Sequence, residues 1–206
     1  TLFIAKVPFN SLGLNKLGPK QYYLWAWFLP VALTLLSGLF TILFGIGKID
    51  LNFTMIRTAL ASTPGGDAVP ASVVVLSQSL LALTLAPFLN MLFTMGEELG
   101  WRGFLLPRLL PLGQWKAVLW SGLIWGLWHA PVIVQGHNYP GYPILGVFMM
   151  IIFCFLLGTI IAWLYINTKS PWVAALIHGA VNAIAGLPVL FLAPGFNMAF
   201  GGTLAA

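Results

Sequence analysis

Charge is scarce in this chain of 206 residues, because Asp, Glu, Lys and Arg together make up only 6% of it. Hydrophobic residues make up 60%, and the mean hydropathy is +0.96. A soluble protein of this length needs a much larger charged fraction on its surface. The composition therefore excludes a soluble globular domain and predicts a protein that crosses the membrane several times.

Cysteine and clustered basic residues are scarce as well. The one cysteine, Cys154, lies in an apolar run, so the chain cannot form an internal disulfide bond. The net charge of +5 comes from scattered Lys and Arg residues rather than from a run or stripe, which argues against a nucleic-acid partner. We find no internal repeat and no soluble domain, so residues 1–206 are expected to form a single membrane domain in contact with the lipid bilayer.

Five apolar segments are long enough to cross the hydrocarbon core, which needs about 20 helical residues. Helices are expected because unpaired backbone groups cannot face lipid, so the predicted fold is an all-α transmembrane bundle with at least five spans. Gly and Pro residues separate the segments. They cover Tyr23–Ile46, Ala71–Met95, Lys116–Val134, Ile144–Ile166 and Trp172–Leu192. A short surface helix is predicted over Leu51–Leu60.

The basic residues predict the orientation of the bundle. If the segment before the first span is cytoplasmic, seven of the nine Lys and Arg residues lie inside. Only Lys48 and Arg57 then lie outside. The connection Gln135–Pro143 faces outward and contains no Lys or Arg.

Nearly all the polar chemistry of the apolar segments lies in three short clusters. They read Glu97-Glu98-Leu99-Gly100-Trp101-Arg102, Trp125-Gly126-Leu127-Trp128-His129 and His178-Gly179-Ala180-Val181-Asn182. Two of the four acidic residues and two of the three histidines belong to them. Ionisable groups inside a membrane are costly, so they are candidate functional residues. His137 lies in the outward connection and receives no role.

Depth in the bilayer decides whether these clusters can meet. At helical rise, His129 and His178 lie roughly 20 and 13 Å from the cytoplasmic ends of their segments, near the middle of the membrane. Glu97 would lie at the cytoplasmic end of a straight second span. We expect Pro87 to break that span, so that a helix over residues 87–106 carries Glu97 near mid-depth. The alternative is a shallow site in a cavity open to the cytoplasm.

The two adjacent glutamates have different surroundings. Glu98 and Arg102 are four residues apart and are neighbours on one helix face. An ion pair that lowers the cost of burial explains Glu98 as well as catalysis does. Glu97 points about 100° round the helix and has no equally well-placed cation. A carboxylate in an apolar cavity can take a proton from water, so Glu97 is the candidate general base.

The histidine clusters also have structural interpretations. His129 could be a core histidine that packs beside Trp125, one turn earlier. His178 and Asn182 share a helix face, and they could form a polar clamp between helices or donate hydrogen bonds to one point. Taken singly, each structural interpretation is favoured. Taken together, these interpretations leave unexplained why the buried titratable groups gather in three clusters.

In this order and spacing the clusters resemble the motifs of the CPBP family. That family contains the CAAX prenyl endopeptidases and the bacteriocin-processing or self-immunity proteins, also called Abi proteins. The matching positions are Glu97, Glu98 and Arg102 in the first motif, Trp125 and His129 in the second, and His178 and Asn182 in the third. Trp125 stands where the family usually has Phe. The resemblance covers residues 71–192 as a catalytic core.

The resemblance implies a glutamate-dependent intramembrane endopeptidase. Its substrates would be membrane-associated peptides or proteins, including prenylated or leader-type ones. Glu97 would be the general base, and His129 would help to hold the attacking water. His178 and Asn182 would stabilise the oxyanion, since both can donate N–H groups to one developing charge.

The resemblance gives Glu98 and Arg102 the role of positioning the first motif. A cofactor is a separate question, because Glu97, His129 and His178 could supply an open zinc site. No HExxH-type pair places two ligands on one helix. The sequence therefore favours a site without a cofactor, with a divalent metal such as zinc as the alternative.

Two other classes compete with the protease. One is a non-catalytic membrane scaffold or bacteriocin self-immunity protein, against which the intact motifs argue. The other is a proton-relaying transporter, for which internal repeats and paired discontinuous helices are missing. We expect a multi-pass protein in the plasma membrane of a prokaryote. Residue 1 is Thr and family members usually have more than five spans, so a chain cut at its start is expected.

Overall fold

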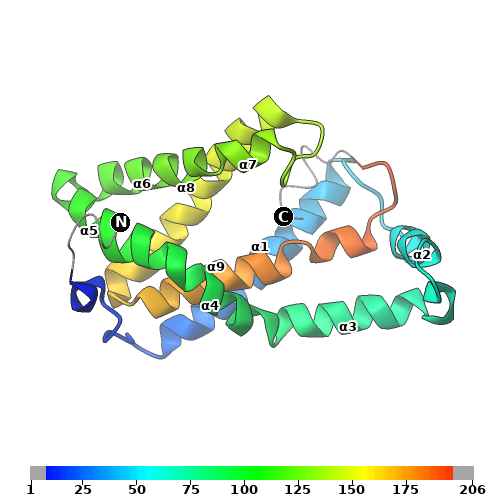
Figure 1. The fold of residues 1–206 in the computed structure, drawn as a ribbon, viewed down its shortest axis with the longest axis horizontal. Helices are drawn as coiled ribbons and strands as arrows, with labels where there is room; N and C mark the ends of the chain where they lie inside the picture. The colour runs from blue at the N-terminus through cyan, green and yellow to red at the C-terminus, as the bar shows by residue number, and fades with distance from the viewer. Residues whose placement is uncertain (1–7, 197–206) are drawn as a thin grey trace.

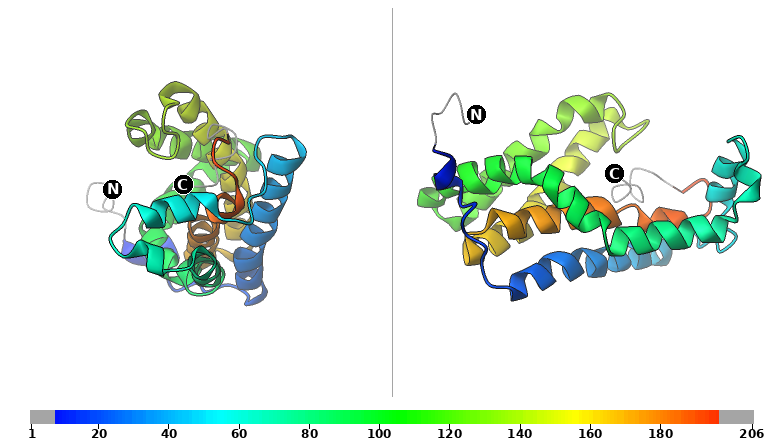
Figure 2. Two further views of the ribbon diagram at one scale, coloured as in Figure 1. Left: turned by 90° about the vertical axis from the view of Figure 1, so that its right-hand side faces the viewer. Right: turned by 60° about the horizontal axis from the view of Figure 1, so that its bottom comes forward.

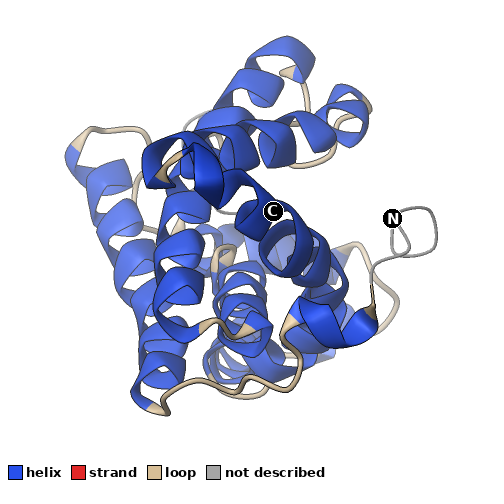
Figure 3. Cartoon of the chain, turned by 90° about the vertical axis from the view of Figure 1, so that its left-hand side faces the viewer, coloured by secondary structure: helices blue, strands red, loops and turns tan. Residues whose placement is uncertain are grey.

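The chain folds as a helical bundle, seen in a computed structural model that describes residues 8–196. Among these residues the backbone forms helices and their connections, and the isolated β-bridge between Ile49 and Leu192 does not extend into a strand. Figure 3 shows this all-helical arrangement. The expected all-α fold is confirmed.

Four stretches of the described chain are long and apolar enough to cross a membrane. They are α1 (Gln21–Leu43), α6 with α7 (Gln114–Trp128 and Ala130–Val134), α8 (Pro143–Thr168), and α9 with the 3-10 helix η5 (Pro171–Ile184 and Leu187–Phe191). A fifth candidate span consists of α3 (Ala71–Leu83) and the helical stretch Ala86–Leu112, which meet at 53°. The five predicted apolar segments therefore correspond to these five helical units.

The bend after α3 follows from Pro87. Proline has no backbone N–H, so it cannot donate to the carbonyl four residues earlier. That carbonyl belongs to Leu83, the last residue of α3, and it accepts a hydrogen bond from Trp27 Nε1 of α1 at 2.9 Å instead. α4 (Ala86–Glu98) then begins with Pro87 in its first turn, where proline is tolerated. The predicted break is confirmed.

The helix that carries the glutamates changes its winding beyond Glu98. α4 continues as a π-helix, η3 (Leu99–Leu105), followed by the short helices α5 (Leu106–Leu109) and η4 (Leu110–Leu112). Trp101 and Arg102 lie in the π-helical turn. Such turns within helices are frequent at functional sites.

α9 is the central helix of the bundle. Every residue from Val173 to Ala180 is buried, and the helix packs against α1, α4 and α8 (Figures 1 and 2). Gly179 allows the closest approach, because a Cβ atom there would lie 2.5 Å from the backbone nitrogen of Met91 in α4. Small residues at helix contacts are typical of membrane bundles. This contact brings the third cluster beside the first.

The second cluster is positioned by a similar contact between α6 and α8. Gly122 and Gly126 lie one turn apart on α6, and a Cβ atom on either would come within 3.0 Å of a Cα atom of α8. Those Cα atoms belong to Phe155 and Ile151. The close approach of the two backbones fixes the end of α6, where His129 lies.

The described basic residues gather at two ends of the bundle. Trp172 Nε1 donates to the Leu14 carbonyl at 2.8 Å, which ties the N-terminal segment to the start of α9. α5 lies at this same end, and α2 (Thr54–Ala61) lies at the opposite one (Figure 1). Lys48 and Arg57 are thus separated from the other described basic residues, as predicted. Lys6 lies outside the described residues, and the cytoplasmic side stays a prediction.

The predicted surface helix at the far end is α2, and none of its residues is buried. Asp50 precedes it and accepts hydrogen bonds from the backbone N–H groups of Thr54 at 2.7 Å and Asn52 at 2.9 Å. Hydrogen bonds from the side chain and backbone of Thr54 hold the pKa of the Asp50 carboxyl below its usual range. The carboxylate therefore caps this exposed helix.

Candidate functional site

Glu98 is the buried centre of a charged network. Its Oε1 atom accepts hydrogen bonds from Arg102 Nη1 at 2.6 Å and from His178 Nδ1 at 2.8 Å. All three side chains are buried. The ion pair predicted from the four-residue spacing is present, and His178 joins it from α9. A buried carboxylate needs such partners, so Glu98 has a clear structural role.

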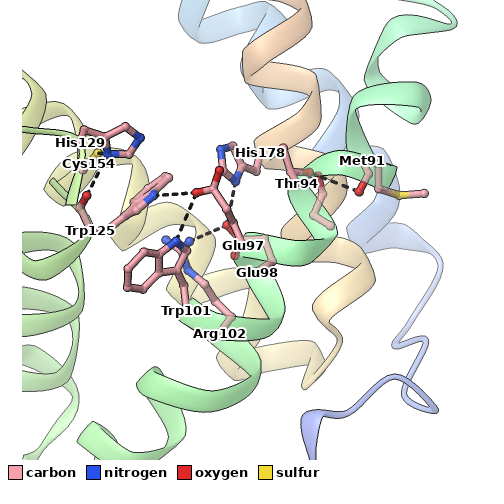
Figure 4. Close-up of polar contacts among 11 residues, drawn as sticks. Met91, Thr94, Glu97, Glu98, Trp101, Arg102, Trp125, His129, Cys154 and His178 are labelled. Atoms are coloured by element: carbon pink, nitrogen blue, oxygen red, sulfur yellow. Dashed lines mark hydrogen bonds and ion pairs between the residues drawn. The ribbon is translucent and has the colours of Figure 1, made fainter. Parts of the chain in front are cut away.

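Glu97 faces a different set of groups. Its Oε2 atom accepts hydrogen bonds from Trp101 Nε1 at 3.3 Å and from Trp125 Nε1 at 3.2 Å (Figure 4). Among the described residues, the ion pairs of this cluster go to Glu98, and none reaches Glu97. The predicted contrast between the two glutamates is therefore present in the structure.

Trp125 belongs to the second cluster and contacts residues of the other two. It is 2% exposed, and the Arg102 guanidinium carbon lies 4.6 Å from its ring centroid. Its ring also meets the imidazole of His178 edge-on, with centroids 5.1 Å apart, and lies 5.9 Å from that of His129. The sequence predicted only the packing against His129, so the wider role of Trp125 is a finding of the structure.

His129 is oriented by the end of its own helix. Its Nδ1 atom lies 2.8 Å from the Trp125 carbonyl oxygen, which can only accept a hydrogen bond. Nδ1 therefore carries the proton, and Nε2 of the neutral ring carries a lone pair. The thiol of Cys154 on α8 lies 3.8 Å from the same Nδ1 atom. This geometry gives His129 an acceptor nitrogen.

His178 is oriented by Glu98 in the same way. Because the carboxylate accepts, Nδ1 of His178 carries a proton, and the bond forms the polar clamp between α9 and α4 that the sequence allowed. Nε2 then accepts in the neutral ring and donates only in the imidazolium. The hydrogen bond between His178 and Glu98 is thus compatible with a catalytic role for His178.

A small pocket joins the second and third clusters. Its volume is about 60 Å³, and Trp125, His129, His178 and Asn182 contribute to its lining. Asn182 lies one turn beyond His178 on α9 and is exposed. Glu97 does not line this pocket, but its carboxylate contacts Trp125, which does. The structure therefore brings His129, His178 and Asn182 to one pocket. Glu97, the fourth expected residue, contacts the lining residue Trp125.

Three residues near this site were not assigned by the sequence. Asn138, in the connection between α7 and α8, lines the pocket and has a buried Oδ1 atom without a described hydrogen-bond partner. Nothing in its sequence context predicts this. Cys154 also lines the pocket, and its position depends on the packing of α8. Trp101 lies four residues after Glu97, so helical spacing alone could have indicated its contact.

The described residues contain no group of three or more His, Cys, Asp and Glu side chains arranged to hold a metal ion. The carboxylate of Glu98 is instead occupied by Arg102 and His178. The donors that the sequence offered for zinc, Glu97, His129 and His178, contact tryptophan rings, a backbone carbonyl and Glu98 respectively.

The bundle and its buried polar cluster define an integral membrane protein with a glutamate–histidine site. Residues 71–184, more than half of the chain, match the family described as type II CAAX prenyl endopeptidase Rce1-like. The chain belongs to this family, which confirms the resemblance seen in the motifs. The match includes all seven motif positions.

Among curated proteins, the CAAX prenyl protease 2 of Methanococcus maripaludis (strain DSM 14266) is similar to this chain. It is 34% identical over 46% of the chain and 37% of its own length. The chain thus spans little more than a third of that relative. No solved structure matches the chain significantly.

Proposed function

We propose that this protein is an intramembrane endopeptidase in which Glu97 and His129 activate a water molecule. Its substrates are membrane-associated peptides or proteins of prenylated or leader type. The observation that carries the proposal is the contrast between the glutamates: Glu98 is held by two cationic or protonated groups, whereas Glu97 has only neutral donors. A carboxylate without a bound cation is available to accept a proton.

In the proposed reaction, the water oxygen bonds to the carbon of the scissile carbonyl while its proton passes to Glu97. His129 offers its Nε2 lone pair to the second hydrogen of the same water, because its Nδ1 proton is committed to the Trp125 carbonyl. The carbonyl oxygen becomes an oxyanion. The C–N bond then breaks, and the proton returns from Glu97 to the leaving amine.

His178 and Asn182 are proposed to stabilise that oxyanion. The Asn182 amide can donate without any change of charge. His178 has to be an imidazolium to donate from Nε2, since Nδ1 is bonded to Glu98. Two preorganised donors aimed at one developing charge are an effective source of catalysis. Glu98 thereby acts on the reaction through His178, and Arg102 holds Glu98 in place.

We propose that this chemistry requires no metal. The support is the arrangement of the possible donors, since the described residues hold no group of three or more His, Cys, Asp and Glu side chains placed to bind one ion. Incubation of the purified protein with a strong chelator, followed by removal of the chelator, should leave cleavage unchanged. Loss of cleavage that returns with added zinc would contradict this part of the proposal.

The cellular setting is a further part of the proposal. We place the protein in the plasma membrane of a prokaryotic cell, where it would act on peptides or membrane proteins of its own cell. The name of the Methanococcus maripaludis relative, a CAAX prenyl protease, makes a farnesylated CAAX peptide the first probe.

Two measurements test the proposal. First, peptide fragments are compared in membranes from cells that express the wild type or Glu97→Gln, a comparison that works for a substrate of any sequence. Second, the purified proteins are mixed in liposomes with a quenched fluorescent peptide that ends in a farnesylated CAAX sequence. Fragments that depend on Glu97 support the protease. Identical fragments with both proteins would favour the scaffold or self-immunity role, which does not need the base.

A further inference from the structure

We propose that the indole N–H groups of Trp101 and Trp125 form a clamp that positions the Glu97 carboxylate to take a proton from the attacking water. Both are positioning residues, because they act through Glu97 and do not touch the reacting atoms. The inference rests on the proposed function for its catalytic consequence. The clamp itself rests on the two hydrogen bonds to Glu97 Oε2, at 3.3 and 3.2 Å.

The clamp joins two helices. Trp101 lies one turn beyond Glu97 on the π-helical continuation of α4, whereas Trp125 reaches it from α6. Figure 4 shows both indoles directed at the same carboxylate. Two donors from separate elements restrict the rotation of a side chain more than one local donor does. The carboxylate therefore has a defined orientation although no cation holds it.

The chemistry of indole suits this task. The indole N–H donates and cannot accept, so it offers the carboxylate a hydrogen bond in one direction only. A guanidinium would give stronger, bidentate bonds and a compensating positive charge. With two neutral donors, Glu97 keeps its negative charge uncompensated. Both described bonds use Oε2, and none of the described side chains bonds to Oε1, which leaves Oε1 to meet the water.

The packing of the Trp125 ring is distinct from the hydrogen bond that its N–H group donates to Glu97. The face of its ring meets the Arg102 guanidinium, and the ring packs edge-on against His178. These contacts would persist with any aromatic ring of similar size. A phenylalanine at this position would fill part of the same space but would donate nothing to Glu97. The hydrogen bond is therefore separable from the packing by chemical substitution.

The first test detects the clamp without any substrate. The chain has nine tryptophans, so protein labelled with ¹⁵N-tryptophan in detergent gives up to nine indole N–H signals. The signals lost in Trp101→Phe and Trp125→Phe identify the two indoles. In Glu97→Ala, these two signals should shift and exchange faster with solvent, and the Trp120 signal should not move. Unchanged signals from both indoles would overturn the clamp.

The second test measures its effect on catalysis. Replacing Trp125 by benzothienylalanine, in which sulfur takes the place of the N–H group, keeps the bicyclic shape and removes the donor. With the farnesylated probe peptide, kcat should fall roughly tenfold, as expected for one hydrogen bond to a charged group, with KM changed less than about twofold. Trp120→Phe, a matched change on the exposed side of α6, should leave both constants unchanged.

The outcomes separate the two proposals. A wild-type kcat in the benzothienylalanine protein would overturn the positioning role. Equal losses in Trp125→Phe and Trp120→Phe would also overturn it, since they would reflect general packing of α6. Trp101→Phe provides an independent second variant if Trp125→Phe fails to fold. Retained cleavage by Glu97→Gln would refute the proposed function, while the indole signals would still decide whether the clamp exists.

Discussion

His178 donates a hydrogen bond from Nδ1 to Glu98 Oε1 over 2.8 Å and so joins α9 to α4 at the level of the candidate site. Because that nitrogen is occupied, His178 can donate to a substrate only from Nε2 and only as an imidazolium. The Glu98 carboxylate holds the ring that carries this nitrogen, through a hydrogen bond that its negative charge strengthens. The role of Glu98 in the proposed reaction therefore depends on its charge more than on its shape.

This relationship predicts the behaviour of Glu98→Gln. The amide keeps the shape and one acceptor, but it replaces the charge-assisted hydrogen bond that orients the His178 ring by a weaker, neutral one. We expect kcat to fall by about 10²-fold, the typical effect of losing one oxyanion donor, while the variant still inserts into the membrane. Cleavage of the farnesylated probe peptide measures it. Asp50→Asn is the matched control at the far end of the bundle, and activity equal to wild type in both variants would contradict the prediction.

Arg102→Ala tests the buried ion pair. It leaves Glu98 buried with only His178 as a partner, and breaking such a pair costs about 3–5 kcal/mol. Thermal unfolding in detergent should begin at a clearly lower temperature, and activity should fall as well. Arg108→Ala removes an exposed arginine from the neighbouring helix α5 and should unfold like the wild type. Similar unfolding of all three proteins would show that the pair contributes little.

Gly179→Ala tests the contact that brings α9 to α4. The new Cβ atom would lie 2.5 Å from the Met91 nitrogen, 2.8 Å from the Pro87 oxygen and 2.9 Å from the Asn90 carbonyl carbon, all backbone atoms that cannot rotate away. We expect a loss of stability of about 1–3 kcal/mol from overpacking, together with lower activity. Gly96→Ala on α4 meets no atom within 4 Å and should be neutral or slightly stabilising. The unfolding temperatures of Gly179→Ala and Gly96→Ala test both expectations.

Orientation can be tested by labelling single cysteines in intact cells, in a Cys154→Ser background. Gln114 and Lys169 are exposed and lie at the end that carries most of the basic residues. Cysteines at these positions should not react with a membrane-impermeant thiol reagent added outside, because cytoplasmic loops carry the excess of Lys and Arg. A cysteine at the exposed His137 should react. The reverse pattern would invert the assignment.

Features set by local spacing could be predicted from the sequence. The break before Pro87 follows from a missing N–H group, and the pair of Glu98 with Arg102 follows from helical geometry. The partner of the freed Leu83 carbonyl, Trp27, lies 56 residues away. It depends on how α1 packs and has no signal along the chain.

The candidate site was predictable to a similar extent. The motifs identified its members, but the bond between His178 and Glu98 spans 80 residues and requires the close packing permitted by Gly179. The π-helical turn has no recognisable sequence signal. The position of Asn138 over the pocket depends on the fold of a connection that contains neither a motif nor a periodic pattern.

The most direct measurement is cleavage by Glu97→Gln together with its amount in the membrane. Gln keeps the size of the side chain and can still accept from both indoles, but it cannot take a proton from water. We expect the variant to accumulate to wild-type levels and to unfold at the same temperature, but to cleave neither the farnesylated peptide nor cellular substrates. Cleavage at the wild-type rate by a folded Glu97→Gln protein would remove Glu97 as the base and contradict the proposed mechanism.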